Sequence, residues 1–552
     1  MNIPTKSFRL AFRPVSLSWA LFLAVATNSY AGSATWNLSP TNTDWNTAAN
    51  WTPATVPNDP FDIATFDVSN VTAISVAAGI DLSEIAFNPG ASSFTFNLPT
   101  EFSVGLVQFV FSGAGIVNDS KVMQNFVTNG VEAGGLAASR LILSGSSTLG
   151  DLVTVTNAST PLGQGSSADG GSTEFNDSSS AGNATVINRG GLCRRCGGGH
   201  AQFTYSSTAG NATIISNGGE VPGAWGSYTL FGDTSSAGRA TVIAQGGVGE
   251  WAQGGRVLFG GYGNGADATL IARSGRDHGG AGRIVVTQDA TGERAQVQLF
   301  KGGSLDVSGA NGVVTIGSLQ GEGHVSLGGT ELVVGSNSAT TVMTGTIADR
   351  GGLLDGEGGS LGKIGRGKLT LTGANEYTGG TTILGGILEA NNNSGSATGS
   401  GPVQVEQGTL SGRGTIGGDV TVGTGTGKGA VVAPGRAAHN PVTLTMEKTN
   451  TFLADATYSC DIYSDGVPAK ADGIAANGVT IAEGAAILVN DAGNTSLTPG
   501  TIFTIVTNTA ATPIIGTFSN LLDGGTLTVG NNTFEANYEG GDGNDLTLTV
   551  LP

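Results

Sequence analysis

The residues in this chain whose types and spacing could do chemistry are Cys193 and Cys196, followed by His200. They offer two thiols and an imidazole within a short stretch, but a structural zinc site takes four ligands. The other histidines lie far away in the sequence: His278, His324 and His439. A redox-active Cys-x-x-Cys needs a thioredoxin-like strand and helix, which the neighbouring residues do not predict. We therefore favour a local disulfide or a pair of inert thiols, with metal binding and redox chemistry as open alternatives.

A histidine could serve as a general acid or base at His278, within Arg276-Asp277-His278, or at His324. Polysaccharide-cleaving enzymes of repetitive β fold gather Asp, Lys or Arg on one face, and glycoside hydrolysis normally uses two carboxylates. In the repeat frame described below, one surface position instead reads Asn183, Asn211, Arg239 and Asp267. The sequence accordingly predicts no catalytic residue.

The stretch Gly540-Gly541-Asp542-Gly543-Asn544-Asp545 matches the first six positions of a calcium-binding nonapeptide repeat. Such sites need tandem copies because each ion is shared between neighbouring turns, and this sequence has one copy. Thr547 also stands where a large apolar residue is expected. A simple turn is therefore favoured over a calcium site, and the sequence predicts no metal ligand and no cofactor.

The elements that must position these residues follow a 28-residue repeat. At this spacing, a phenylalanine recurs ahead of a short apolar run. The phenylalanines are Phe175, Phe203, Phe231 and Phe259, and the runs are Ala184-Thr185-Val186-Ile187, Ala212-Thr213-Ile214-Ile215, Ala240-Thr241-Val242-Ile243 and Ala268-Thr269-Leu270-Ile271. Short β-branched runs bounded by glycine are typical of strands, and a fixed period of this size is typical of a solenoid.

The predicted fold is all-β: a right-handed parallel β-helix in which each repeat forms one coil. Stacking in register would place Phe on Phe and Ile on Ile at a strand spacing of roughly 4.8 Å. We expect both columns to lie inside the helix. Glycine, which accounts for 92 of the 552 residues, supplies the corner turns, and only 12% of the residues are charged.

Residues 1–31 have the features of a secretory signal peptide. Lys6, Arg9 and Arg13 form a basic start, an apolar stretch follows, and Ser29-Tyr30-Ala31 is a small-x-small cleavage site. The apolar stretch is too short to span a bilayer, and no later segment approaches the roughly 18 apolar residues that spanning takes. We therefore expect an exported protein, extracellular or at the cell surface, without a transmembrane segment in the mature chain.

The chain is acidic, with a formal net charge of −18. The expected signal peptide holds three of the 24 basic residues and none of the 42 acidic ones, so the mature chain has 21 basic residues, 42 acidic residues and a net charge of −21. Binding to nucleic acid depends on neutralising phosphates with Lys and Arg. The sequence therefore predicts no nucleic-acid partner, and its charge favours solubility of an extended repeat protein.

A specific motif lies in the second half of the chain, at residues 367–388. It reads Gly367-Lys368-Leu369-Thr370-Leu371-Thr372-Gly373-Ala374-Asn375-Glu376-Tyr377-Thr378-Gly379-Gly380-Thr381-Thr382-Ile383, followed by Gly385-Gly386-Ile387-Leu388. This segment resembles one copy of the autotransporter-associated β-strand repeat. The resemblance implies a secreted passenger β-helix and brings no catalytic residues with it. Because the sequence ends at Pro552 without a series of alternating strands, we expect a passenger that lacks a C-terminal translocator barrel.

Five segments are expected along the chain. They are a signal peptide at 1–31, a Trp-rich N-terminal cap with the first coils at 32–130, the 28-residue coils at 131–303, further coils at 304–440 that include the motif, and a C-terminal β cap at 441–552. Trp36, Trp45 and Trp51 cluster near the start. We favour a role for them in covering the open first coil, and a platform that stacks on sugars is the alternative.

Taken together, these features predict a secreted or surface-associated β-helix with a structural or adhesive role and no catalytic activity. Its expected partners are surface glycans or other copies of the same chain. The alternative is an extracellular polysaccharide-active enzyme, a lyase or a hydrolase.

Overall fold

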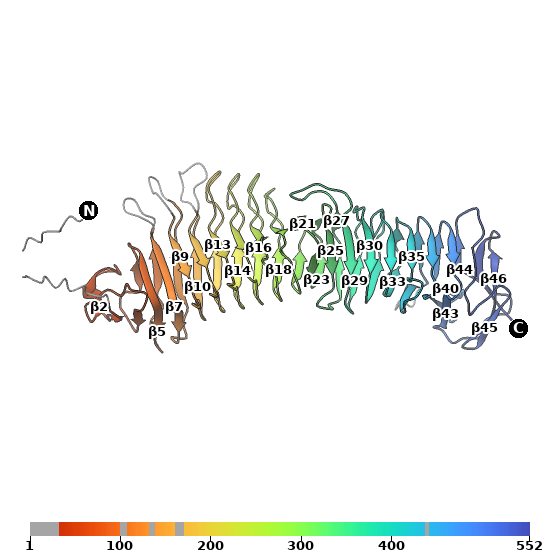
Figure 1. Cartoon of the computed structure of the whole chain (residues 1–552), viewed down its shortest axis with the longest axis horizontal. Helices are drawn as coiled ribbons and strands as arrows, with labels where there is room; N and C mark the ends of the chain where they lie inside the picture. Colours follow the sequence, from red (N-terminus) through yellow and green to blue (C-terminus); the bar gives the residue numbers. More distant parts are fainter. Residues whose placement is uncertain (1–31, 100–106, 132–137, 160–169, 436–440) are drawn as a thin grey trace, which may run out of the picture.

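The computed structural model describes residues 32–99, 107–131, 138–159, 170–435 and 441–552. The expected signal peptide and His439 lie outside the described residues. The described chain winds into an elongated solenoid with the first coils at one end and the last strands at the other (Figure 1). Within these ranges the one helical element is a 3-10 turn, η1 (Ala48–Asn50), and no helix is long and apolar enough to cross a bilayer. The prediction of an all-β parallel β-helix is confirmed.

Sheet I forms one side of the solenoid and is parallel except for its first pair, β2 and β1. Its strands in spatial order are β2 (Trp51–Thr52), β1 (Ala34–Trp36), β3 (Ile63–Phe66), β5 (Ile80–Phe87), β7 (Gln108–Asn118), β9 (Arg140–Leu143), β11 (Ser172–Phe175), β13 (His200–Phe203), β15 (Tyr228–Phe231), β17 (Arg256–Phe259), β19 (Arg283–Gln288), β21 (Ser304–Ala310), β24 (His324–Ser326) and β27 (Thr346–Ala348).

Sheet II forms a second side and follows the whole axis, with parallel pairing from β4 to β43. Its strands in order are β4 (Ala73–Ser75), β6 (Thr95–Leu98), β8 (Gln124–Thr128), β10 (Val153–Asn157), β12 (Thr185–Asn188), β14 (Thr213–Ser216), β16 (Thr241–Ala244), β18 (Thr269–Ala272), β20 (Gln296–Leu299), β23 (Ser318–Gly321), β26 (Thr341–Met343), β29 (Lys368–Leu371), β31 (Ile387–Ala390), β33 (Gly408–Gly412), β36 (Ala430–Pro434), β39 (Ala456–Tyr463) and β43 (Ala486–Asp491). The short β40 (Lys470–Ala471) pairs with β39 in the antiparallel sense.

The third side changes along the axis. In the 28-residue coils it consists of single-residue bridges, such as Ser180 to Thr208 and Thr208 to Ser236. Sheet III then takes over with β22 (Val314–Ile316), β25 (Glu331–Val334), β28 (Ser360–Lys363), β30 (Gly380–Ile383), β32 (Val403–Val405), β35 (Val420–Val422), β38 (Asn450–Phe452) and β42 (Val479–Ile481). Sheet IV lies toward the C-terminus, with β34 (Thr415–Ile416), β37 (Thr443–Met446), β41 (Gly473–Ala476), β44 (Ile502–Asn508), β47 (Asp545–Val550), β46 (Asn532–Gly540) and β45 (Thr526–Val529).

The phenylalanines of the repeat stack inside the solenoid as predicted. Phe175 pairs with Phe203, Phe203 with Phe231, and Phe231 with Phe259. The ring centroids are 4.3, 4.8 and 4.9 Å apart, and the planes of neighbouring rings differ by no more than 13°. All four side chains are buried, so one ring per coil builds a continuous aromatic column in the core.

The isoleucine column is also in register, but it faces outward, so the prediction that it lies inside is wrong. Ile187, Ile215, Ile243 and Ile271 pair in succession on the outer face of sheet II. Side chains alternate across a strand, and the preceding residue in each coil is the one that points into the core. Those inward residues are Val186, Ile214, Val242 and Leu270, and none is more than 2% exposed.

The residue after each isoleucine points inward again, and in the first two of these coils it is polar, Asn188 and then Ser216. Asn157 occupies the same column one coil earlier. Asn157 and Asn188 are fully buried, and Nδ2 of Asn157 donates to Oδ1 of Asn188 at 2.7 Å. Nδ2 of Asn188 in turn donates to Oγ of Ser216 at 3.3 Å and to Oγ1 of Thr229 at 3.1 Å. These hydrogen bonds compensate for the loss of water around buried amides.

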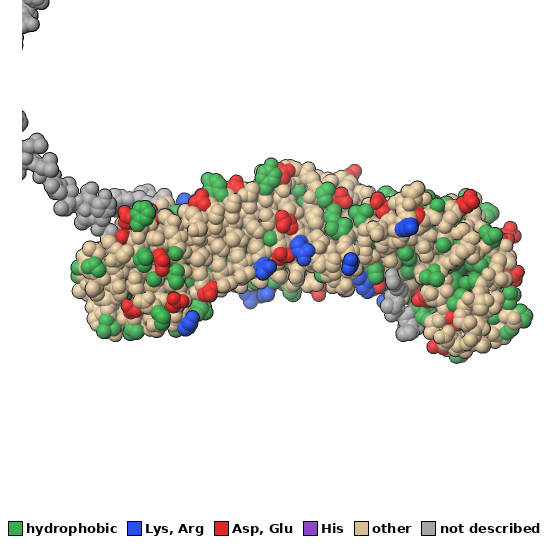
Figure 2. Space-filling model, turned by 60° about the horizontal axis from the view of Figure 1, so that its bottom comes forward, with side chains coloured by type: hydrophobic (Ala, Val, Ile, Leu, Met, Phe, Trp, Pro, Cys, Tyr) green, Lys and Arg blue, Asp and Glu red, His purple; other side chains and the backbone are tan. Residues whose placement is uncertain are grey.

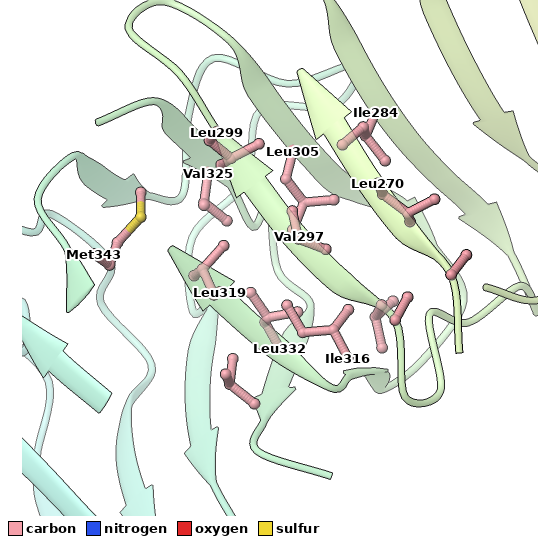
Figure 3. Close-up of a cluster of buried hydrophobic side chains, with 14 of the residues drawn as sticks. Leu270, Ile284, Val297, Leu299, Leu305, Ile316, Leu319, Val325, Leu332 and Met343 are labelled. Carbon is pink, nitrogen blue, oxygen red and sulfur yellow. The ribbon is translucent and has the colours of Figure 1, made fainter. Parts of the chain in front are cut away.

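Figure 3 shows the core where the third sheet begins. Side chains of sheets I and II meet those of sheet III there, for example Leu305, Val297 and Ile316, and all three are buried. The coils shorten at this point. Val297 pairs with Leu319 and Leu305 with Val325, and these partners are closer in sequence than those of the preceding coils. A strand on every side lets a shorter coil close around the core.

Both ends of the solenoid are covered. At the N-terminal end, Trp36, Trp45 and Trp51 are at most 1% exposed, and the ring centroids of Trp45 and Trp51 are 4.7 Å apart. A ring that stacks on a sugar needs an open face, so these buried rings offer no sugar platform; they pack against one another at this end of the solenoid. At the C-terminal end, parallel coils continue to β44, and the antiparallel strands β47, β46 and β45 complete the fold.

Candidate functional site

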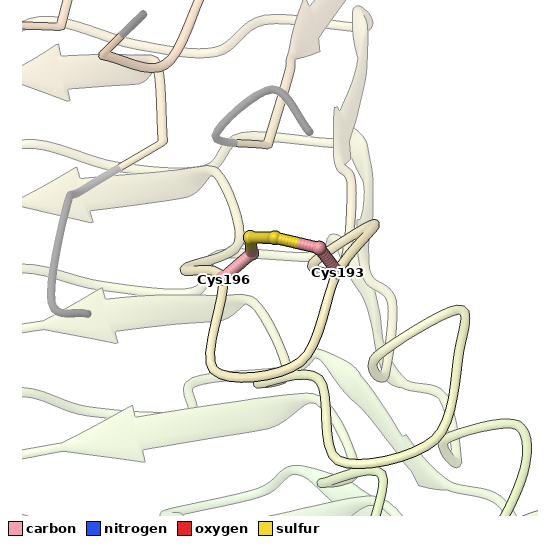
Figure 4. The surroundings of a disulfide bond; sticks show 2 residues. All are labelled: Cys193 and Cys196. Carbon is pink, nitrogen blue, oxygen red and sulfur yellow. A yellow bond between two sulfur atoms is a disulfide. The ribbon is translucent and has the colours of Figure 1, made fainter. Parts of the chain in front are cut away.

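Cys193 and Cys196 are joined by a disulfide within a single loop (Figure 4), and their Cα atoms are 5.1 Å apart. The sequence left a disulfide and a pair of inert thiols open, and the structure contains the disulfide. The third cysteine, Cys460, is buried and outside any disulfide in the described chain. Within the described ranges, no three His, Cys, Asp or Glu side chains gather closely enough to hold a metal ion.

The histidines considered as acids or bases lie apart from one another. His200 begins β13 and stacks on Tyr228 of the next coil, with ring centroids 4.8 Å apart. His324 occupies the same column of sheet I five coils further on, roughly 24 Å away at the usual strand spacing. Its Nε2 lies 3.1 Å from the carbonyl oxygen of Arg350. His278 and Asp277 are exposed at the tip of a loop, both with positive φ.

The glycine-rich stretch near the C-terminus forms the turn between β46 and β47. Gly540 pairs with Asp545 across this hairpin. The carboxylate of Asp545 is mostly buried and accepts a hydrogen bond from the backbone N–H of Asn508 at 2.9 Å. The side chain thus connects the hairpin to β44.

The motif at 367–388 consists of residues that connect successive coils. Oδ1 of Asn375 accepts the backbone N–H of Ile347 at 2.8 Å, and its Nδ2 donates to the carbonyl oxygen of Ala397 at 2.6 Å. Sheet I has ended at β27 and sheet IV has not yet begun, so this side chain takes the place of a strand on that side. The ring of Tyr377 fills the core, and its hydroxyl lies 2.6 Å from Oγ1 of Thr381. The motif therefore has a structural role in this chain.

Four loops connect sheet II to sheet I in the 28-residue coils and rise on one side of the molecule (Figure 1). We call them the loop crest, and they comprise residues 189–199, 217–227, 245–255 and 273–282. Backbone hydrogen bonds join each loop to the next, for example Gly223 N–H to Glu250 O at 3.0 Å. The glycine pairs allow this close approach, because a Cβ on Gly190 would fall on the carbonyl oxygen of Gly218.

A groove follows the base of the loop crest and runs along several coils. Its first part is a cavity of about 690 Å³ between the strand exits of sheet II and the crest, lined by Asn217, Gln245, Arg273 and Arg276 among others. Its second part is a cavity of about 510 Å³ over β20, β23 and β26, lined by Gln298, Phe300, Lys301 and Gln320 among others. Ser274 lines both cavities, so they adjoin.

The groove presents one side chain per coil in a regular column. The residue after each strand of sheet II is Asn217, Gln245, Arg273 and then Phe300. Each donates its backbone N–H to the coil before it, as Gln245 does to Ser216 O at 2.8 Å and Arg273 to Ala244 O at 2.9 Å. The Arg273 guanidinium lies 5.7 Å from the centroid of the Phe300 ring, within the range of a cation–π contact.

Charge is distributed unevenly along the rod. Residues 170–440 hold 17 basic and 19 acidic residues, whereas residues 32–169 and 441–552 together hold 4 basic and 23 acidic ones. On the face shown in Figure 2, most of the Lys and Arg side chains in view lie along the middle of the rod. The negative charge of residues 32–552 is therefore concentrated toward the two ends, and the groove lies in the balanced middle.

Sequence reasoning missed the groove, although a signal was present. The second position after each apolar run holds Arg189, Asn217, Gln245 and Arg273, polar side chains immediately before small residues. Their placement along one line depends on how the loop crest stacks. It also depends on the shorter coils that follow, which bring Gln298 and Gln320 into register.

Comparison with known proteins gives a family match and a relative of part of the chain. Residues 361–390 match the passenger-associated transport repeat, and this match contains the motif at 367–388. The chain thus contains a passenger-associated transport repeat at the place where its sequence resembles the autotransporter-associated β-strand repeat. A stretch of 116 residues is 38% identical to the adhesin BmaC autotransporter of Brucella suis biovar 1 (strain 1330). That stretch is 20% of this chain and 3% of the relative, so the chain spans only a small part of that protein.

Proposed function

We propose that this protein is a non-catalytic adhesive passenger that acts at the cell surface or outside the cell and binds glycans. The observation that carries the proposal is the groove along the base of the loop crest, with amide, aromatic and guanidinium side chains at one-coil intervals. Amides both donate and accept hydrogen bonds, and an exposed ring offers an apolar face, which together suit the hydroxyls and the ring faces of sugars. A polymeric ligand with a regular repeat fits a surface on which side chains recur at a regular interval.

Two further findings support an adhesive role. The chain contains a passenger-associated transport repeat, and a relative of part of the chain is described as an adhesin. The loop crest varies in sequence while the core columns beneath it stay regular, and binding residues are often placed on loops that a rigid scaffold holds.

The experiment is a glycan-array binding screen run beside an assay for released reducing sugar on the same glycans. Binding without sugar release is the expected result. Sugar release that disappears in Asp277→Asn or His278→Ala would replace the adhesive function with a polysaccharide-active enzyme. Binding neither glycans nor other surfaces, together with self-association in ultracentrifugation, would instead favour contacts between copies of the chain.

A further inference from the structure

Three cations stand out in the groove because they are exposed and outside the ion pairs of the described chain. Arg273, Arg276 and Lys301 line the groove, and none is in a salt bridge with a residue in the described part of the chain. Several other charges of the same coils are already paired, including Arg189 with Glu220 at 2.8 Å and Arg294 with Asp267 at 2.9 Å. The groove therefore has uncompensated positive charge.

The anionic groups in the groove do not cancel this charge. Glu220 lines the first cavity, but its two carboxylate oxygens already accept hydrogen bonds from Nε and Nη2 of Arg189, at 2.8 and 3.0 Å. Glu322 lines the second cavity. Among the described residues, this leaves three cations and the Glu322 carboxylate outside salt bridges, while residues 32–552 have a net charge of −21.

The side chains next to the cations indicate which kind of anion fits. Gln298 and Gln320 pair in register on neighbouring strands, so their amides repeat at one-coil spacing. Phe300 is 49% exposed between them and Arg273. A groove for an acidic peptide would be expected to offer an open strand edge, whereas β20 and β23 of this groove are paired on both sides. Amides, a ring face and guanidinium groups together match a chain of sugar acids.

We propose that this groove binds an anionic polysaccharide that lies along the solenoid axis, with carboxylate or sulfate groups on Arg273, Arg276 and Lys301. The proposal rests on the adhesive function above and names its ligand class and its site. Arginine pairs with carboxylate and sulfate through parallel N–H···O bonds, and the two amides hydrogen-bond the hydroxyls between the charged groups. The excess of acidic residues at the two ends of the rod favours a ligand held over its middle.

The test compares two double variants that remove the same charge. Arg276→Gln with Lys301→Gln changes the groove, and Arg239→Gln with Arg256→Gln changes two exposed arginines of the same coils outside it. The probes are immobilised polygalacturonate, dextran sulfate and neutral dextran. All four substitutions are at exposed positions, and circular dichroism and thermal melting verify that each variant keeps the fold.

The wild-type protein is expected to bind polygalacturonate or dextran sulfate more tightly than dextran, and added salt is expected to weaken that binding. The groove variant should lose about tenfold or more in affinity, the order expected for losing a charged hydrogen bond, and the control variant should bind like the wild type. Preference between the two anionic probes distinguishes carboxylate from sulfate ligands.

Equal affinity of the groove and control variants would overturn the assignment of the site, and equal binding of dextran would overturn the assignment of an anionic ligand. In both cases the adhesive function would stand if the array shows binding to other glycans. No binding to either anionic probe would also refute the inference. Absence of binding to every glycan on the array would in addition refute the proposed function.

Discussion

Lys363 places an amino group inside the β-helix, in a column that otherwise holds Val334, Ile383 and Val405. Its side chain is 1% exposed, and Nζ donates to the carbonyl oxygens of Ile364 at 2.6 Å and Gly385 at 3.2 Å. Burial lowers the pKa of the Lys363 ammonium group to about 8, because the charged form loses its hydration. This residue lies within the matched transport repeat.

We expect the wild-type protein to gain stability as the pH rises above about 8. In the folded state Lys363 releases its proton near that pH, whereas in the unfolded chain a lysine keeps its proton to about pH 10.4. The unfolded state therefore binds more protons in this window, and the unfolding free energy rises with pH, by about 2 kcal/mol between pH 8 and 9.5. Urea titrations at several pH values measure this change in the unfolding free energy.

Lys363→Met serves as the control for this prediction, because Met has a similar length and no ionisable group. The difference in unfolding free energy between wild type and variant should change across the window, while contributions of other groups cancel. A difference that is constant with pH would show that Lys363 does not titrate in the folded state.

At the scale of single strands, the inward and outward columns of the 28-residue coils should respond differently to truncation. Phe203→Ala removes a buried ring between two stacked neighbours and should cost about 3–5 kcal/mol. Ile215→Ala removes a half-buried side chain from the outer face and should cost markedly less. Hydrogen exchange of the backbone amides of β13 to β16 measures the loss of stability in both variants. Equal losses would contradict the assignment of the two faces.

Asn375 provides a second test, because it joins three consecutive coils where one side of the solenoid has no strand. Asn375→Ala would leave the N–H of Ile347 and the carbonyl of Ala397 without their partner, at a cost of about 1–3 kcal/mol for each buried group. Thr382→Ala, on the partly exposed face of β30, is the control. Limited proteolysis near residues 347–397 should accelerate only in the Asn375 variant, and identical digestion of the two would refute the role.

The period of the sequence was sufficient to predict the coils, and less informative about which way each side chain points. Phe203 was placed correctly because large rings recurring at a fixed spacing must stack. Ile215 was misplaced because adjacent side chains in a strand point to opposite faces of the sheet. A run of adjacent apolar residues does not show which of them faces the core. The groove was missed because Arg273 and Phe300 become neighbours only through the stacking of coils with different lengths. The repeat shows a recurring polar position that includes Arg273, but it does not show that Phe300 becomes its neighbour.

At the scale of the whole molecule, we expect the covered ends of the solenoid to limit pairing of its sheets with other chains. Trp45→Ala should loosen the N-terminal cap, because this fully buried ring packs on Trp51 and Phe109 at centroid distances of 4.7 and 5.4 Å. We expect concentration-dependent self-association in analytical ultracentrifugation. Phe61→Ala, at a site that is 87% exposed in the same region, is the control. Monomeric behaviour of the Trp45 variant would show that other contacts protect the edge.

The hydrogen bonds between coils run along the length of the rod, since the strands lie across it (Figure 1). A pulling force applied at the two ends would therefore load these bonds lengthwise and peel the coils away one at a time. Each released 28-residue coil becomes an extended segment of roughly 90–100 Å in place of a rise of about 4.8 Å. Under the proposed adhesive function, a tether built this way lengthens under load, and the bound surface moves away in flow while the proposed contact in the groove stays intact.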